Sequence, residues 1–142
     1  MSNISIDKKN RKDKFKHYTI GIPELDSQHW ELLELIAKIK RIIKRGCKRL
    51  VKKYIDKFFI KLNAHIAYEE ALMKTKKFPY ILNHIQQEQV MISKIKVVIH
   101  SDESILHTNT TEMETIIKDH IDNSDSQVLD SYNKWIKSVT NQ

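Results

Sequence analysis

Two histidine–glutamate pairs stand in the middle of the chain at the same interval. His65 is followed four residues later by Glu69, and His84 four residues later by Glu88. This spacing places both members of a pair on one face of a helix, about one turn apart. Large apolar residues fall on the same faces, so these polar groups are predicted to point into the core.

Carboxylates in a core need a positive counter-charge, because an unpaired one is costly to bury. His29 and His120 fall on two further apolar stripes, so each of four predicted helices contributes an imidazole. A single histidine on an apolar face is more often an ordinary core residue, and one such pair is weak evidence. Here four histidines lie on four separate apolar stripes, and two of them are followed by a carboxylate one helical turn later. This combination favours a metal site. Imidazole with carboxylate suits iron, manganese or zinc.

Four amphipathic helices are expected to position these groups. The first is predicted to open after GIPELD, with Asp26 or Ser27 as N-cap, and to end near Gly46. The second starts around Leu50, and Pro79 separates it from the third. The polar stretch HSDESILHTNTT, residues 100–111, is interpreted as the longest connection. The predicted core-facing residues are, helix by helix, His29, Leu32, Leu33, Ile36, Ile39 and Ile43; Phe58, Leu62, His65, Glu69, Leu72 and Met73; Ile81, His84, Ile85, Glu88, Met91, Ile92, Ile95 and Val98 or Ile99; and Met113, Ile116, Ile117, His120 and Ile121.

This pattern predicts an all-α fold, an antiparallel up-down four-helix bundle. A further apolar-periodic piece, from Val128 to Ile136, is expected to extend the last helix or to form a short extra one. Residues 1–14 are expected to be a loose basic arm, and residues 1–142 a single domain. Two glycines and two prolines are too few for a many-turned β architecture.

Composition also limits the cellular locations and the binding partners that we expect. No apolar run reaches the ~20 residues of a membrane span, no export signal is present, and the single Cys47 fits the reducing cytoplasm. The net charge of +7 includes dense basic runs at residues 8–16 and 38–53, but aromatic residues are not interleaved with them. We therefore expect solvated helix faces, with weak attraction to phosphate but no specific nucleic-acid partner and no membrane partner.

The segments GIPELDSQH, HIAYEEALM, FPYILNH and HIDNSD extend from about Gly21 to Asp125. In their order and spacing they resemble the hemerythrin family of non-haem di-iron oxygen-binding proteins, in its single-domain bacterial form. The resemblance implies two iron ions with a bridging oxo or hydroxo group; manganese or zinc is less favoured. The ligand residues that it implies are His29, His65, Glu69, His84, His120 and Asp125, of which Glu69 and Asp125 would bridge the two ions.

Glu88 stands where the family has a seventh ligand, a histidine. The resemblance assigns His84, Glu88 and His120 to one ion and His29 and His65 to the other, which keeps an open position for dioxygen. A third carboxylate adds negative charge and stabilises ferric over ferrous iron; alternatively, Glu88 acts as an acid–base group. On an ideal helix five residues rotate by roughly 500°, so Asp125 reaches the ions only if the helix is widened or interrupted near Asn123 and Ser124.

An apolar oxygen pocket is a further implication of the resemblance, formed by Leu32, Ile66, Ile116, Ile117 and Ile121. Ile66 and Ile116 stand where the family often has phenylalanine and tryptophan, so this pocket would be less bulky. The leading interpretation is a protein that binds dioxygen for storage or sensing. One alternative is an enzyme that consumes peroxide or oxygen, peroxidase-, catalase- or oxidase-like, which Glu88 favours; another is a metal-binding or structural bundle without oxygen chemistry. Dioxygen or peroxide would be the small-molecule partner.

Overall fold

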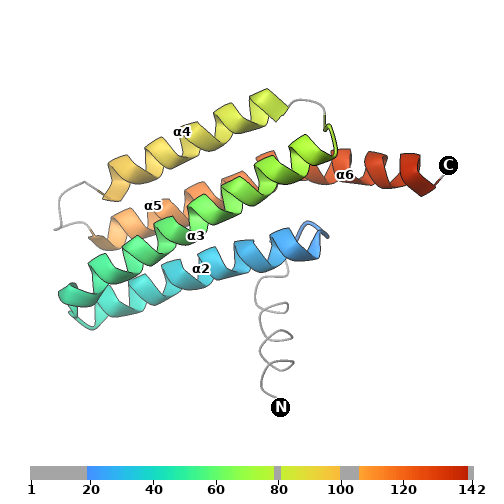
Figure 1. The fold of residues 1–142 in the computed structure, drawn as a ribbon. Helices are drawn as coiled ribbons and strands as arrows, with labels where there is room; N and C mark the ends of the chain where they lie inside the picture. The colour runs from blue at the N-terminus through green and yellow to red at the C-terminus, as the bar shows by residue number, and fades with distance from the viewer. Residues whose placement is uncertain (1–18, 79–80, 100–105, 141–142) are drawn as a thin grey trace, which may run out of the picture.

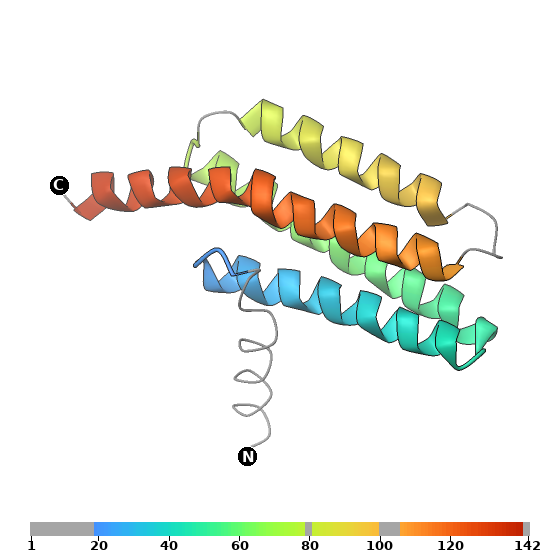
Figure 2. The same cartoon turned by 180° about the vertical axis from the view of Figure 1, so that it is seen from behind.

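The regular elements of the chain are helices throughout the part described by this computed structural model, residues 19–78, 81–99 and 106–140 (Figure 1). They are α2 (Pro23–Lys44), α3 (Lys48–Thr75), α4 (Ile81–Ile99), α5 (Leu106–Asp119), the π-helix η3 (His120–Ser124) and α6 (Asp125–Thr140). Four of them, α2 to α5, form the bundle, and α6 projects beyond it as seen from both sides (Figures 1 and 2). The predicted all-α bundle with a C-terminal extension is confirmed; the predicted arm, residues 1–14, and Pro79 lie outside the described residues.

The start of α2 differs from the prediction. The helix begins at Pro23, after Ile22, and not behind Asp26 or Ser27. Proline suits this position because its missing N–H would be unsatisfied in the first turn anyway. Asp26 is buried within the first turn, where its carboxylate accepts hydrogen bonds from the backbone N–H of Ile20 at 2.8 Å and Gly21 at 3.1 Å. Its side chain therefore ties the preceding segment to the helix.

The core follows the predicted stripes closely, because helical periodicity selects the residues that face inward. Phe58, Leu62, Ile36 and Ile95 are fully buried. On α2 the buried residue of the last turns is Ile42, and the predicted Ile43 is only half-buried. The helix ends as predicted just before Gly46, whose φ of +77° is a conformation that glycine adopts without strain.

The connection before α5 is shorter than predicted. Of the stretch 100–111, residues from Leu106 onward are already helical, and residues 100–105 lie outside the described ranges. Asn109 and Thr110, whose polarity suggested a loop, are buried in α5. Composition misled the prediction here because packing of the first turns of α5 overrides the polarity of single side chains.

The π-helix joins α5 to α6 without a break (Figure 2). A π-helix bonds residue i to i+5, so residues five apart lie about one turn from each other. η3 begins at His120 and ends immediately before Asp125. The widening that Asp125 would require is thus present in the backbone, although the side chain of Asp125 is outside the described part of the structure.

Candidate metal centre

Six of the seven predicted ligand side chains come together in one buried cluster. α2 contributes His29, α3 contributes His65 and Glu69, α4 contributes His84 and Glu88, and His120 stands at the start of η3. All six are buried, and His29 and Glu69 have no exposed surface at all. Because each ring or carboxylate projects from a different part of the bundle wall, the cluster fills the space between the helices.

Glu69 lies at the middle of this cluster, and its two oxygens face different partners. Oε1 is 2.7 Å from Nε2 of His65, and 3.7 Å from Nε2 of both His29 and His120. Oε2 accepts a hydrogen bond from Nε2–H of His84 at 2.8 Å. A carboxylate with three histidine nitrogens near one oxygen and a fourth at the other has the form of a bridge between two cations.

The donor atoms also form two groups compatible with metal binding. Ligand atoms of His29, His65, Glu69 and His120 all lie within 4.8 Å of one another, and the same holds for Glu69, His84 and Glu88. The resemblance placed His120 with His84, yet its Nε2 lies in the group of His29 and His65. Its ring is nonetheless about equally far from both sides, with centroids 6.1 Å from His84 and 6.3 Å from His29.

Glu88 is 1 % exposed and points into the cluster, so it is not a surface glutamate. Its Oε1 is 2.5 Å from Nε2 of His84, whereas Oε2 accepts no hydrogen bond within the described residues. Burial raises the pKa of Glu88 to about 7: the hydrogen bond from His84 opposes the shift, and the charge of Glu69 adds to it.

The pKa values of His84 and Glu69 are shifted by the neighbouring charges as well. Burial lowers the pKa of His84, but hydrogen bonds and charge from Glu69 and Glu88 outweigh it and raise the pKa to about 10. Burial opposes ionisation of Glu69 as well, yet the charge of His65 and hydrogen bonds from three histidines hold its pKa well below the usual value. Without a metal, the proton held by His84 thus offsets part of the negative charge of the two carboxylates, and a metal would displace it.

Gln28 orients His65 from outside the cluster, a role that sequence analysis missed. Its side-chain carbonyl accepts a hydrogen bond from Nδ1–H of His65 at 2.7 Å. The Nε2 of a neutral His65 is then an acceptor, and it faces Glu69 Oε1, another acceptor, at 2.7 Å. Such a contact requires a cation between or beside the two atoms, a proton or a metal. The only signal in the sequence was the position of Gln28, one residue before His29.

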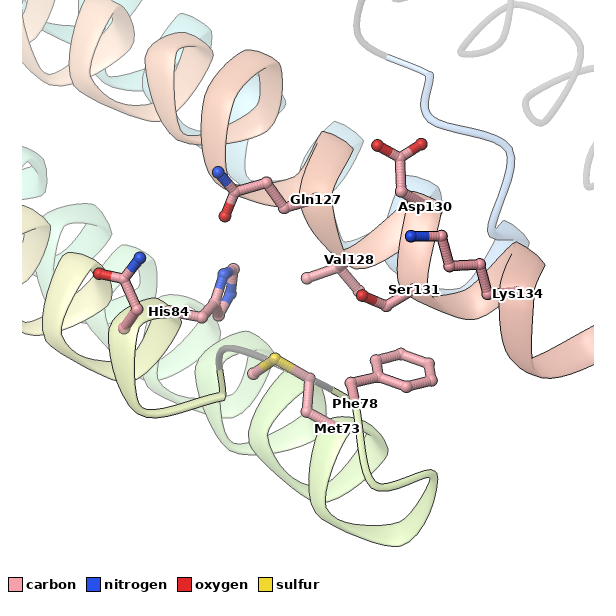
Figure 3. Close-up of a pocket in the computed structure, with 9 residues that line it drawn as sticks. Met73, Phe78, His84, Gln127, Val128, Asp130, Ser131 and Lys134 are labelled. Carbon is pink, nitrogen blue, oxygen red and sulfur yellow. The ribbon is translucent and has the colours of Figure 1, made fainter.

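Two hollows approach the cluster. A cavity of about 300 Å³ reaches His84 between the end of α3, the start of α4 and α6; Met73, Phe78 and Val128 line it, with polar Gln127, Ser131 and Lys134 (Figure 3). A groove of about 400 Å³ between α4 and α5 reaches His120. Each opening thus reaches one histidine of the cluster, His84 or His120.

The predicted oxygen-pocket residues divide into two sets. Leu32, Ile66, Ile117 and Ile121 are buried in the main core. Ile116 is half-buried and lines the groove between α4 and α5. The apolar environment predicted for the site is therefore present around four of the five residues, and the fifth stands at an entrance.

The donor set fits metal ions on grounds of its chemistry. Four imidazoles and two carboxylates are buried together, with a carboxylate oxygen, Glu88 Oε2, that finds no donor among the described residues. Nitrogen and oxygen donors of this kind suit iron, manganese or zinc. The chain therefore carries a buried histidine–glutamate cluster suited to metal binding.

Comparison with known proteins gives the same description. Residues 20–131 match the family model described as the hemerythrin HHE cation binding domain. The chain is also similar to proteins called bacteriohemerythrin from Campylobacter jejuni subsp. jejuni, serotypes O:6 and O:23/36. Identity to each is 29 % over 119 residues, which cover 80 % of this chain and 89 % of the relative. No solved structure matches it. Because the family model spans most of the chain and its helices hold the buried histidine–glutamate cluster, the chain belongs to the hemerythrin family.

Proposed function

We propose that this protein holds two iron ions in the buried cluster and binds dioxygen there. The observation that carries the proposal is the position of Glu69: Oε1 faces the ring nitrogens of His29, His65 and His120, and Oε2 faces that of His84. The name of the Campylobacter relatives, bacteriohemerythrin, supports the same function. Iron would supply an open coordination position and the electrons that dioxygen binding requires.

The residues that would hold the two ions are those of the cluster, with Asp125 as a second bridging carboxylate. The π-helix between His120 and Asp125 supports this role, because it shortens the angular separation of the two residues. The resulting ligand set is His29, His65, Glu69, His84, Glu88, His120 and Asp125.

The surrounding side chains would control what reaches the ions. Leu32, Ile66, Ile117 and Ile121 exclude water and protons, which favours reversible binding over loss of a reduced oxygen species. Gln28 holds the ring of His65 with Nε2 directed at Glu69. Both effects preorganise the site, so little rearrangement is needed when a small molecule enters. The exposed, unpaired Cys47 supports a location in the reducing cytoplasm.

The test is a visible absorption spectrum of the iron-loaded, reduced protein, recorded while oxygen is admitted and then removed. A charge-transfer band that appears, persists and vanishes on degassing is the expected result. Metal analysis of protein isolated without added metal should give about two irons per chain. Zinc alone, or no metal, would refute the proposal in favour of a structural bundle.

A second candidate function, an enzyme that consumes peroxide or oxygen, is favoured by Glu88. Its carboxyl is buried in the cluster beside Nε2 of His84, a position suited to donating or accepting a proton during turnover. The Glu88→His variant restores the family's usual ligand and separates the two candidates. If the wild type oxidises at once and the variant holds oxygen reversibly, the protein is the enzyme. If both hold it reversibly at equal autoxidation rates, the carrier function stands.

A further inference from the structure

Within the described part of the chain, one segment is especially rich in basic residues. Ten of the 25 lysines and arginines lie within residues 38–57, which contain one acidic residue, Asp56. The segment therefore has a formal charge of +9, more than the +7 of the whole chain. We name it the basic tip: Lys38, Lys40, Arg41, Lys44, Arg45, Lys48, Arg49, Lys52, Lys53 and Lys57.

The fold gathers these residues at one end of the bundle. The last turns of α2 and the first turns of α3 lie side by side and meet at the tight turn through Gly46, at one end of the bundle (Figure 1). The two helix ends that carry the basic residues are therefore neighbours. The histidine cluster is farther along the bundle. Along α2 alone, His29 precedes Lys44 by fifteen residues, or about 22 Å of helix. Contact through the basic tip would leave the cavity at His84 open.

Most cations of the tip are exposed: eight of the nine whose side chains the structure describes. Among its described residues, the ion pair to a carboxylate is that of Lys40 with Glu114, at 3.0 Å. Lys38 and Lys57 instead crowd onto Tyr54, with their ammonium groups 4.5 Å and 4.9 Å from the ring centroid. Each of these contacts is a cation–π interaction and leaves the positive charge in place, so the tip as a whole remains a surface of like charges that attracts an external polyanion.

Two features separate an anionic bilayer from a nucleic acid as this polyanion. Leu50, in the first turn of α3, is 42 % exposed among the cations of the tip. An apolar side chain surrounded by basic ones suits the boundary between lipid headgroups and acyl chains. Tyr54, the aromatic residue of the tip, is half-buried and its ring is already in contact with the ammonium groups of Lys38 and Lys57, so it is a poor platform for stacking a base.

We propose that the basic tip binds the surface of an anionic lipid bilayer, with Leu50 entering the interface and the surrounding lysines and arginines contacting lipid phosphates. Residues with long alkyl stems such as lysine cover apolar surface while their charges stay at the headgroups. This contact needs no membrane-spanning segment, and no helix of the described residues is long and apolar enough to cross a membrane. The inference is independent of which metal the centre holds.

Co-sedimentation of the full-length protein with vesicles tests the proposal. Vesicles of phosphatidylcholine mixed with phosphatidylglycerol should bind it, pure phosphatidylcholine vesicles should not, and added salt should weaken the binding. Lys52→Glu with Lys53→Glu should weaken binding at least roughly tenfold. The matched control is Lys94→Glu with Lys96→Glu, which makes the same charge change on exposed positions of α4 and should bind nearly as well as wild type.

Leu50→Ser tests the apolar contact, because it leaves the charge unchanged. It should weaken vesicle binding roughly fivefold while retention on duplex DNA stays the same. Equal losses in the two charge-reversed variants would show that only net charge matters and would overturn the proposal. A Leu50→Ser variant that binds vesicles like wild type, or a wild type that binds duplex DNA but no vesicles, would overturn the choice of a bilayer. Circular dichroism and metal content should be unchanged in all variants.

Discussion

Metal binding to this centre should release protons, and the share from Glu88 should depend on pH. With its pKa raised to about 7, Glu88 holds a proton in about half of the metal-free molecules at about pH 7. His84, with a pKa raised to about 10, is protonated at that pH. Ligands must lose their protons to bind metal, so this pair should contribute about 1.5 protons. At about pH 8.5 Glu88 is already ionised, and the contribution should fall to about one.

Calorimetric titration with Zn²⁺ in two buffers of different ionisation enthalpy measures this release, and zinc avoids any redox reaction. Glu88→Gln is the control, because it keeps the shape of the side chain but has no titratable proton. The variant should release about half a proton less than wild type near pH 7 and the same number near pH 8.5. Subtracting it also removes protons that come from the other histidines.

The reasoning would be refuted if wild type and Glu88→Gln released equal numbers of protons at both pH values. Such a result would mean that Glu88 is ionised in the metal-free cluster or does not bind the metal. A difference that stayed the same at both pH values would instead refute the assignment of a pKa near 7 to this carboxyl.

Four further outcomes follow from the same geometry. Glu69→Gln removes the charge at the middle of the cluster and should reduce bound metal from about two ions per chain to one or none by elemental analysis; two retained ions would show that it is no bridge. Gln28→Leu removes the acceptor that orients a histidine and should weaken zinc affinity ~10–100-fold, with Gln28→Glu close to wild type; equal affinities would contradict the orienting role. Phe58→Ala empties a fully buried site and should cost about 3–5 kcal/mol of unfolding free energy in urea without changing metal stoichiometry. In the metal-free protein Glu88 and His84 both bind protons more tightly when folded, so their stabilising contribution is complete at low pH and is lost as pH rises through about 7 and about 10. Urea unfolding of the metal-free chain should therefore show stability falling across this window; a rise would contradict it.

Most of the residues that face inward could be predicted from the sequence. Apolar periodicity predicted the helices and placed His65 with Glu69 and His84 with Glu88, because a spacing of four is a local property of one helix. It also indicated that four histidines share the core, and the structure brings all four together. The interval between His120 and Asp125 pointed to a widened helix, and η3 lies there.

Residue type alone predicted the ends of the helices less well than it predicted their buried faces. Asp26 has the residue type of an N-cap, but its carboxylate binds backbone groups that precede the helix. Asn109 and Thr110 have the composition of a loop, yet they are buried in α5. In both places tertiary packing selects one of several conformations that the local sequence allows.

The arrangement of the cluster across the helices comes from the tertiary structure. Glu69 separates His84 from His29 and His65, and the ring nitrogen of His120 joins the group of His29 and His65. Gln28 reaches a ring on another helix. All of these features depend on distances between helices. Periodicity describes the face of one helix at a time. The separation and rotation of neighbouring helices are set by how all their side chains pack together, and these quantities determine which donor atoms can meet at one ion.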